Sequence, residues 1–104
     1  MKTDKFNEIV HELDTHAQET MNAKGPEYTV QDEDVLNNFK ATAKKLGVDP
    51  LIVWYAYFDK QVSSVAAHVS NHDLNKAEPM ISRFGDIINY AKLGYALFTE
   101  RDKL

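Results

Sequence analysis

The stretch DPLIVWYAYFDKQVSSVAAHVS, residues 49–70, decides the fold of this chain. It opens with Asp49 in an N-cap position and Pro50 at the first helical position, a strong helix start. Apolar residues then recur at intervals of three and four, the spacing of one helix face. They are Ile52, Tyr55, Ala56, Val62, Ala66 and Val69. We therefore expect a helix over residues 50–70 with this stripe facing a core.

Three other segments show the same helical period. Glu78-Pro79 repeats the start signal and opens a helix over 78–101, and Gly47 ends a shorter helix over 34–46 that Asp32 or Asp34 would cap. A first helix over 3–22 is expected to stop at Lys24-Gly25-Pro26. No segment alternates as a strand does, so we expect one all-α domain, residues 1–104, folded as an antiparallel four-helix bundle.

The last helix is apolar along two lines rather than one. Gly85 and Gly94 each cost up to about 1 kcal/mol in a helix interior relative to alanine, which the close approach of another helix would offset. A helix with so wide an apolar face is either central to the bundle or shared with a second subunit. We expect self-association through this helix, with Ile87, Leu93 and Leu97 in the contact, and hence a homo-oligomer.

Composition narrows the classes of function. The chain has 104 residues, no cysteine and a net charge of -4. The absence of cysteine excludes thiolate catalysis, disulfides and Cys-ligated metal centres. The negative charge argues against a duplex-DNA binder that works by neutralising phosphates. The sequence has neither an apolar run long enough to span a membrane nor a signal peptide, so we expect a cytoplasmic protein.

Two carboxylates interrupt the apolar patterns. Asp59 falls on the stripe of the third helix, and Asp86 begins an apolar line of the fourth. Each has a cation nearby, Lys60 beside the first and Arg83 one turn before the second. A carboxylate that faces a core must be paired, hydrogen-bonded or metal-bound. We expect all four side chains to converge between these helices, either as an ordinary ion pair or as a polar binding site.

A wider set of residues extends from position 24 to position 98. It comprises Lys24, Glu27-Tyr28, Asn38-Phe39, Trp54, Tyr57, Lys60, Glu78-Pro79, Arg83, Asp86 and Asn89-Tyr90. This set resembles small phage-encoded proteins associated with nucleotide modification. Those proteins are in turn similar to the all-α nucleoside triphosphate pyrophosphatases of the MazG and dimeric dUTPase type.

The resemblance implies a helical, self-associating nucleotide-binding protein that uses Mg²⁺. The expected nucleotide-binding residues are Lys60 and Arg83, facing phosphate, with Asn89 and Tyr90 in support. The expected metal ligands are Glu78 and Asp86, with Asp59 as a third candidate from the pattern above. The Glu-x-x-Glu and Glu-x-x-Asp spacings of the pyrophosphatases do not occur here. The expected function is therefore that of an accessory protein of nucleotide metabolism whose catalytic activity stays open.

An alternative of a different class remains beside it. An acidic helical protein could bind and inhibit a host protein, using the net charge of -4 and the acidic run Asp32-Glu33-Asp34. Helix capping already explains that run, because negative charge is favourable at a helix N-terminus.

Overall fold

The described part of the chain folds into four helices. A computed structural model describes residues 1–29, 34–70 and 78–103, with the backbone alone for residues 24–29. The helices are α1 (Thr3–Thr29), α2 (Asn37–Leu46), α3 (Pro50–Ser70) and α4 (Met80–Asp102). These residues contain no strand, so the prediction of an all-α fold of four packed helices is confirmed. No described helix is long and apolar enough to cross a membrane.

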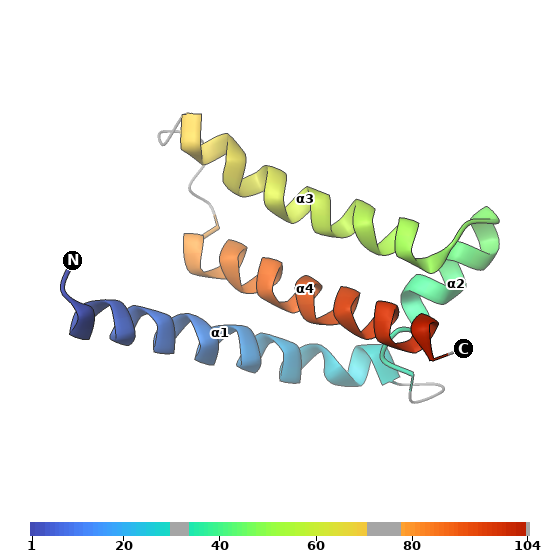
Figure 1. The fold of residues 1–104 in the computed structure, drawn as a ribbon, viewed down its shortest axis with the longest axis horizontal. Coiled ribbons are helices and arrows are strands. Elements are labelled where there is room, and N and C mark those ends of the chain that lie inside the picture. The colour runs from blue at the N-terminus through green and yellow to red at the C-terminus, as the bar shows by residue number, and fades with distance from the viewer. Residues whose placement is uncertain (30–33, 71–77, 104) are drawn as a thin grey trace.

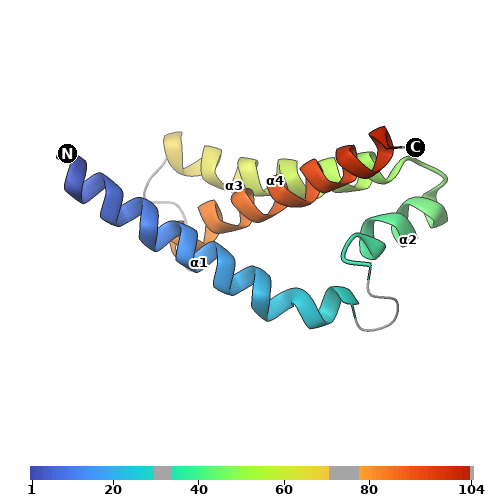
Figure 2. The ribbon, with the colours of Figure 1, turned by 60° about the horizontal axis from the view of Figure 1, so that its bottom comes forward.

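The fourth helix is the centre of the molecule. It packs against α3 on one side and against α1 on the other, and α1 and α3 do not pack against each other in the described part of the chain. The antiparallel pair is α3 and α4, whereas α1 runs in the same direction as α4 (Figures 1 and 2). The short α2 packs mainly on α3, at the end of the molecule where the C-terminus lies. The three long helices therefore form a layer that is open on much of its surface.

Local signals set the start of α3 and the end of α2 as expected. Asp49 Oδ1 accepts a hydrogen bond from the Leu51 amide at 2.8 Å, which caps the first turn of α3. Gly47 adopts the left-handed conformation, with φ of 69°, and its amide donates to the carbonyl of Ala43. Asp34, one of two predicted caps of α2, is not its N-cap: that position is Leu36, which makes no side-chain cap, and Asp34 Oδ1 instead accepts from the Leu36 amide at 2.9 Å. Asp32 lies outside the described residues.

The predicted end of the first helix is wrong. The backbone of α1 continues as a helix through Gly25 and Pro26 to Thr29. A proline in a helix removes one hydrogen bond and crowds one carbonyl, which weakens the helix without necessarily ending it. The other predicted boundaries agree with the structure to within three residues.

The core lies between α2, α3 and α4. Its buried residues are Leu36 just before α2, Phe39 and Ala43 of α2, Val53 of α3, and Leu93 and Leu97 of α4. Leu46, at the very end of α2, is exposed. No large side chain of the described residues is fully buried. The core is therefore thin for a chain of this length.

Both glycines of α4 serve close packing, as predicted, but within one chain. A Cβ at Gly94 would overlap the indole of Trp54, and a Cβ at Gly85 would lie 3.1 Å from His16 Cδ2. Leu93 and Leu97 are buried beside them. The predicted surface of self-association on α4 is thus largely used inside the molecule.

The orientation of α3 differs from the prediction. The stripe predicted to face the core, Ile52, Tyr55, Ala56, Val62, Ala66 and Val69, is exposed throughout. Val53 and Trp54 face α2 and α4 instead. The prediction is wrong because α3 carries apolar side chains around most of its circumference, so that spacing alone does not select one face.

Candidate functional site

A hollow of about 350 Å³ lies where α2, α3 and α4 meet. Its aromatic wall consists of Phe39, Tyr57 and Tyr90, one from each helix. The rings of Tyr57 and Tyr90 are parallel, with centroids 6.1 Å apart, and Phe39 meets both rings edge-on at 6.2 and 6.4 Å. A hollow of this size falls at the lower end of the range for small-molecule sites.

The polar rim of this hollow comes from α2. Asn38, Thr42 and Lys45 line it, and their spacing of four and three places them on one face of the helix. They supply an amide, a hydroxyl and an ammonium group beside the aromatic wall. The sequence reading missed Thr42 and Lys45 as candidates, although their spacing from Asn38 was a usable signal.

One hydrogen bond sets the register of α3 against α4. Trp54 Nε1 donates to the carbonyl of Tyr90 at 2.7 Å, and Tyr57 stacks on the ring of the same residue. Because the two helices are antiparallel, four residues before Tyr90 correspond to four residues after Tyr57. Asp86 is therefore level with Gln61, which is half-buried, whereas Asp59 and Lys60 are exposed.

Three predicted residues follow one line along α4. Tyr90, Asp86 and Arg83 are spaced by four and three, so they share a face that runs from the aromatic hollow toward the start of the helix. Arg83 is half-buried, and its Nε is buried with no hydrogen-bond partner among the described residues. A buried guanidinium donor without an acceptor is unfavourable, so a shift of this side chain toward an anion would be stabilising.

Asn89, also predicted to bind nucleotide, holds two helices together. Its Nδ2 donates to the carbonyl of Ala17 at 2.9 Å, in the buried contact between α4 and α1. Its Oδ1 is buried and has no partner in the part of the chain that the structure describes. The Nδ2 group of Asn89 is therefore used in the contact between α4 and α1 and is not available to a ligand.

The predicted metal ligands do not form a three-residue centre. Asp59 and Glu78 are exposed, and Asp86 is half-buried on α4. Within residues 1–23, 34–70 and 78–103 no three His, Asp or Glu side chains are grouped so that they could hold an ion.

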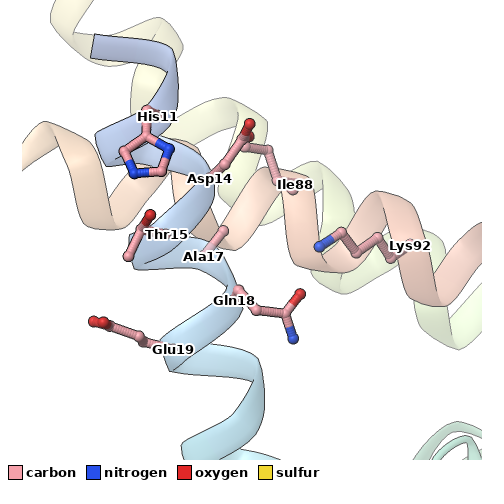
Figure 3. Close-up of a pocket in the computed structure, with 8 residues that line it drawn as sticks. All are labelled: His11, Asp14, Thr15, Ala17, Gln18, Glu19, Ile88 and Lys92. Atoms are coloured by element: carbon pink, nitrogen blue, oxygen red, sulfur yellow. The ribbon is translucent and has the colours of Figure 1, made fainter. Parts of the chain in front are cut away.

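A second hollow, of about 430 Å³, follows the contact between α1 and α4. Figure 3 shows Lys92 extending from α4 toward α1, while Glu19 points away. The other residues that line it are His11, Asp14, Thr15, Ala17 and Gln18 of α1 and Ile88 of α4. It contains none of the residues that the sequence singled out, and it lacks an aromatic wall.

Charged side chains join α2 to the end of α4. Lys40 Nζ lies 2.6 Å from both Asp34 Oδ2 and Glu100 Oε1. The hydrogen bond from Lys40, with that from the Leu36 amide, lowers the pKa of Asp34 below its usual 3.8. The hydrogen bonds to Asp34 and Glu100 raise the pKa of Lys40 above its usual 10.5. Lys40 and Glu100 also line a third hollow, of about 200 Å³.

Lys24, Glu27 and Tyr28, which contribute to the family resemblance, have side chains outside the described part of the structure.

Comparison with known proteins finds no relative of this chain. No protein-family model matches the chain, and no curated protein or solved structure matches it significantly.

Proposed function

We propose that the protein binds a nucleotide at the hollow between α2, α3 and α4. It would serve as a phage-type accessory protein of nucleotide metabolism, related in kind to the all-α pyrophosphatases. One observation carries the proposal: the α4 face that ends at the aromatic hollow also holds Arg83, whose buried Nε has no partner among the described residues.

The side chains match the two halves of a nucleotide. The rings of Tyr57 and Tyr90 offer aromatic surface to a base, an interaction worth about 1–3 kcal/mol per base where it has been measured. Lys45 at the rim of the hollow offers positive charge to phosphate. Arg83, about 10 Å farther along α4, offers a guanidinium that can bind two phosphate oxygens at once. Any Mg²⁺ would be held mainly by the phosphates, with Asp86 as the protein carboxylate on the same face. The proposal covers binding and assigns no cleavage step.

Adjacent lysines on α2 provide a matched test. Both lysines are exposed, but Lys45 lines the hollow and Lys44 does not. We expect a nucleoside triphosphate at about 100 times Kd to stabilise the wild type by about 2.7 kcal/mol, because it binds the folded state alone. A thermal-denaturation panel of triphosphates, with and without Mg²⁺, measures this. Lys45→Gln should reduce the shift strongly, and Lys44→Gln should preserve it.

The two arginines of α4 give a second matched pair. Arg83→Gln should abolish the triphosphate shift while circular dichroism still reports a folded helical protein. Arg101→Gln should keep it, because Arg101 is exposed near the helix end and lies over the ring of Phe98. If no triphosphate raises the midpoint of the wild type under any condition, the nucleotide proposal is refuted.

Protein binding is the second candidate function. It is favoured by Phe6, Ile9 and Val10 of α1, which are exposed apolar side chains that neither the core nor the aromatic hollow uses. Exposed apolar surface of this kind marks interaction sites in many proteins. Two results together would favour this function instead. The wild type would bind a host protein that the Phe6→Lys variant does not bind, and no nucleotide would stabilise the wild type.

A further inference from the structure

The face of α3 that points away from the core carries a mostly apolar stripe that one carboxylate interrupts. We define the outer stripe as Ile52, Tyr55, Asp59, Val62, Ala66 and Val69, all of them exposed. Tyr55 is 59% exposed, Val62 41% and Val69 81%. The positions alternate by three and four, the a and d spacing of a helix that packs along another helix. Five of the six side chains are apolar.

The apolar surface continues onto α4. Phe84, Tyr95 and Phe98 are exposed there, and Tyr95 is 77% exposed. The indole of Trp54 touches the rings of Tyr55 and Phe98, which joins the outer stripe to this part of α4. Together the exposed side chains offer on the order of 700 Å² of apolar surface, close to what one partner contributes to a standard interface. A monomer in water rarely exposes so much.

The order of residues in the outer stripe fits a second copy of the same helix. If two stripes meet antiparallel about a point between residues 60 and 61, Ile52 faces Val69, and Tyr55 faces Ala66. The largest side chain thereby meets the smallest, and Asp59 faces Val62. Every contact then occurs twice, as an isologous two-fold interface requires.

We propose that the protein forms an antiparallel homodimer through the outer stripes of two α3 helices. The exposed aromatic residues of α4 extend the interface on the same side. Asp59 is the one charge in each stripe, so the surface offers little to a charged partner and much to a copy of itself. A polar residue at one such position commonly fixes register and costs some stability. Val53 and Tyr57 pack against α2 on another face, so the dimer leaves the aromatic hollow open.

Two valines of similar exposure make a matched test. Val62 lies in the outer stripe, and Val10, 37% exposed, lies on α1. Sedimentation of the full chain at about 10 μM should give twice the monomer mass of 11.9 kDa for the wild type and for Val10→Asp. Val62→Asp should sediment as a folded monomer. A monomeric wild type, or equal loss of dimer in both variants, would overturn the proposal.

Because the chain has no cysteine, cross-linking can test the antiparallel register directly. Tyr55→Cys mixed with Ala66→Cys should form a disulfide-linked dimer under mild oxidation, and neither variant should cross-link efficiently alone. Within one chain the two positions lie about 16 Å apart along the helix, too far for a disulfide. Efficient self-linking of Tyr55→Cys alone would show a parallel pair and contradict the proposed register.

Asp59 gives the last independent check. Asp59→Val removes two carboxylates from an apolar contact and should tighten the dimer by at least about tenfold in Kd, since burying an unpaired charge is costly. An unchanged or weaker dimer would place Asp59 outside the interface. The rise in the unfolding midpoint of the wild type with nucleotide is measured separately, so the dimer proposal and the nucleotide proposal can each fail without the other.

Discussion

The indole of Trp54 lies directly over Gly94 and sets how closely α3 approaches α4. Its Nε1 is satisfied by the carbonyl of Tyr90, one turn earlier on the same helix. Buried tryptophans usually need such a partner, because a lost hydrogen bond in an apolar contact costs free energy. The spacing and the register of α3 and α4 thus depend on the side chain of Trp54 and on the lack of a side chain at Gly94.

Gly94→Ala should therefore destabilise the protein, although alanine favours a helix by up to about 1 kcal/mol. The added methyl group would overlap the indole ring, and overpacking of this kind typically costs about 1–3 kcal/mol. Urea denaturation followed by Trp54 fluorescence measures the change. Gly85→Ala is the comparison, because there the nearest atom belongs to the His16 ring, which can move. A larger loss at Gly85 would contradict this account.

Signals that act within a few residues could be predicted from the sequence. The Asp49-Pro50 start and the Gly47 end depend only on local hydrogen bonds and on backbone conformation, and both occur as expected. Likewise the spacing of Arg83, Asp86 and Tyr90 places them on one face of α4 without further information. Whether Asp59 lies beside these residues depends instead on how α3 is rotated about its axis, which no local signal determines.

At the scale of elements, Lys40 connects α2 both to the segment before it and to α4. It bridges Asp34, just before α2, and Glu100, near the end of α4. The three side chains are about one-third to one-half exposed, so water screens their attraction in part. The bridge matters because α2 packs mainly on α3, and Lys40 is a direct link from α2 to α4.

Lys40→Met should lower the free energy of unfolding by about 1 kcal/mol at neutral pH. The pKa of Asp34 is lowered by folding, so its contribution is present above pH 3.8 and is lost as the pH falls through the lowered pKa. The pKa of Lys40 is raised, so its contribution is present below pH 10.5 and is lost as the pH rises through the raised pKa.

The difference between wild type and Lys40→Met should consequently be constant near neutrality and smaller at about pH 2, because it shrinks as the pH falls through the lowered pKa of Asp34. Urea denaturation at the two pH values measures it. Lys44→Met, an exposed change in the same helix, should have little effect at either pH. A difference that persists unchanged in acid would assign the effect of Lys40 to packing rather than to charge.

The rotation of α3 shows where prediction of an element from its own sequence stops. Both of its faces are apolar. Trp54 faces α4 because Gly94 leaves room there for an indole, whereas Tyr55 on the outer stripe is exposed. The complementarity between a tryptophan and a glycine forty residues later decides the rotation. The aromatic hollow depends on the same contact, since Tyr57 reaches Tyr90 only in this register.

For the whole molecule, an open layer of three long helices leaves much apolar surface outside. The core cluster has six buried residues, and none of the large described side chains is fully buried. Stability rests mainly on apolar area removed from water, so a single chain of this shape is expected to be only marginally stable. A second copy on the outer stripe would cover the exposed side chains of α3 and enlarge the core.

If the dimer is the stable form, unfolding must depend on protein concentration. A hundredfold rise in chain concentration should stabilise the folded dimer by about 2.7 kcal/mol, because dissociation and unfolding are then one equilibrium. In urea, that corresponds to a rise in midpoint on the order of 1 M between about 1 and 100 μM chain. Circular dichroism measures it at both concentrations. Val62→Asp should unfold at a lower midpoint that no longer depends on concentration, whereas Val10→Asp should keep the dependence of the wild type. A wild-type midpoint that stays constant over this range would mean that the single layer is stable by itself and that the outer stripe has no partner of its own kind.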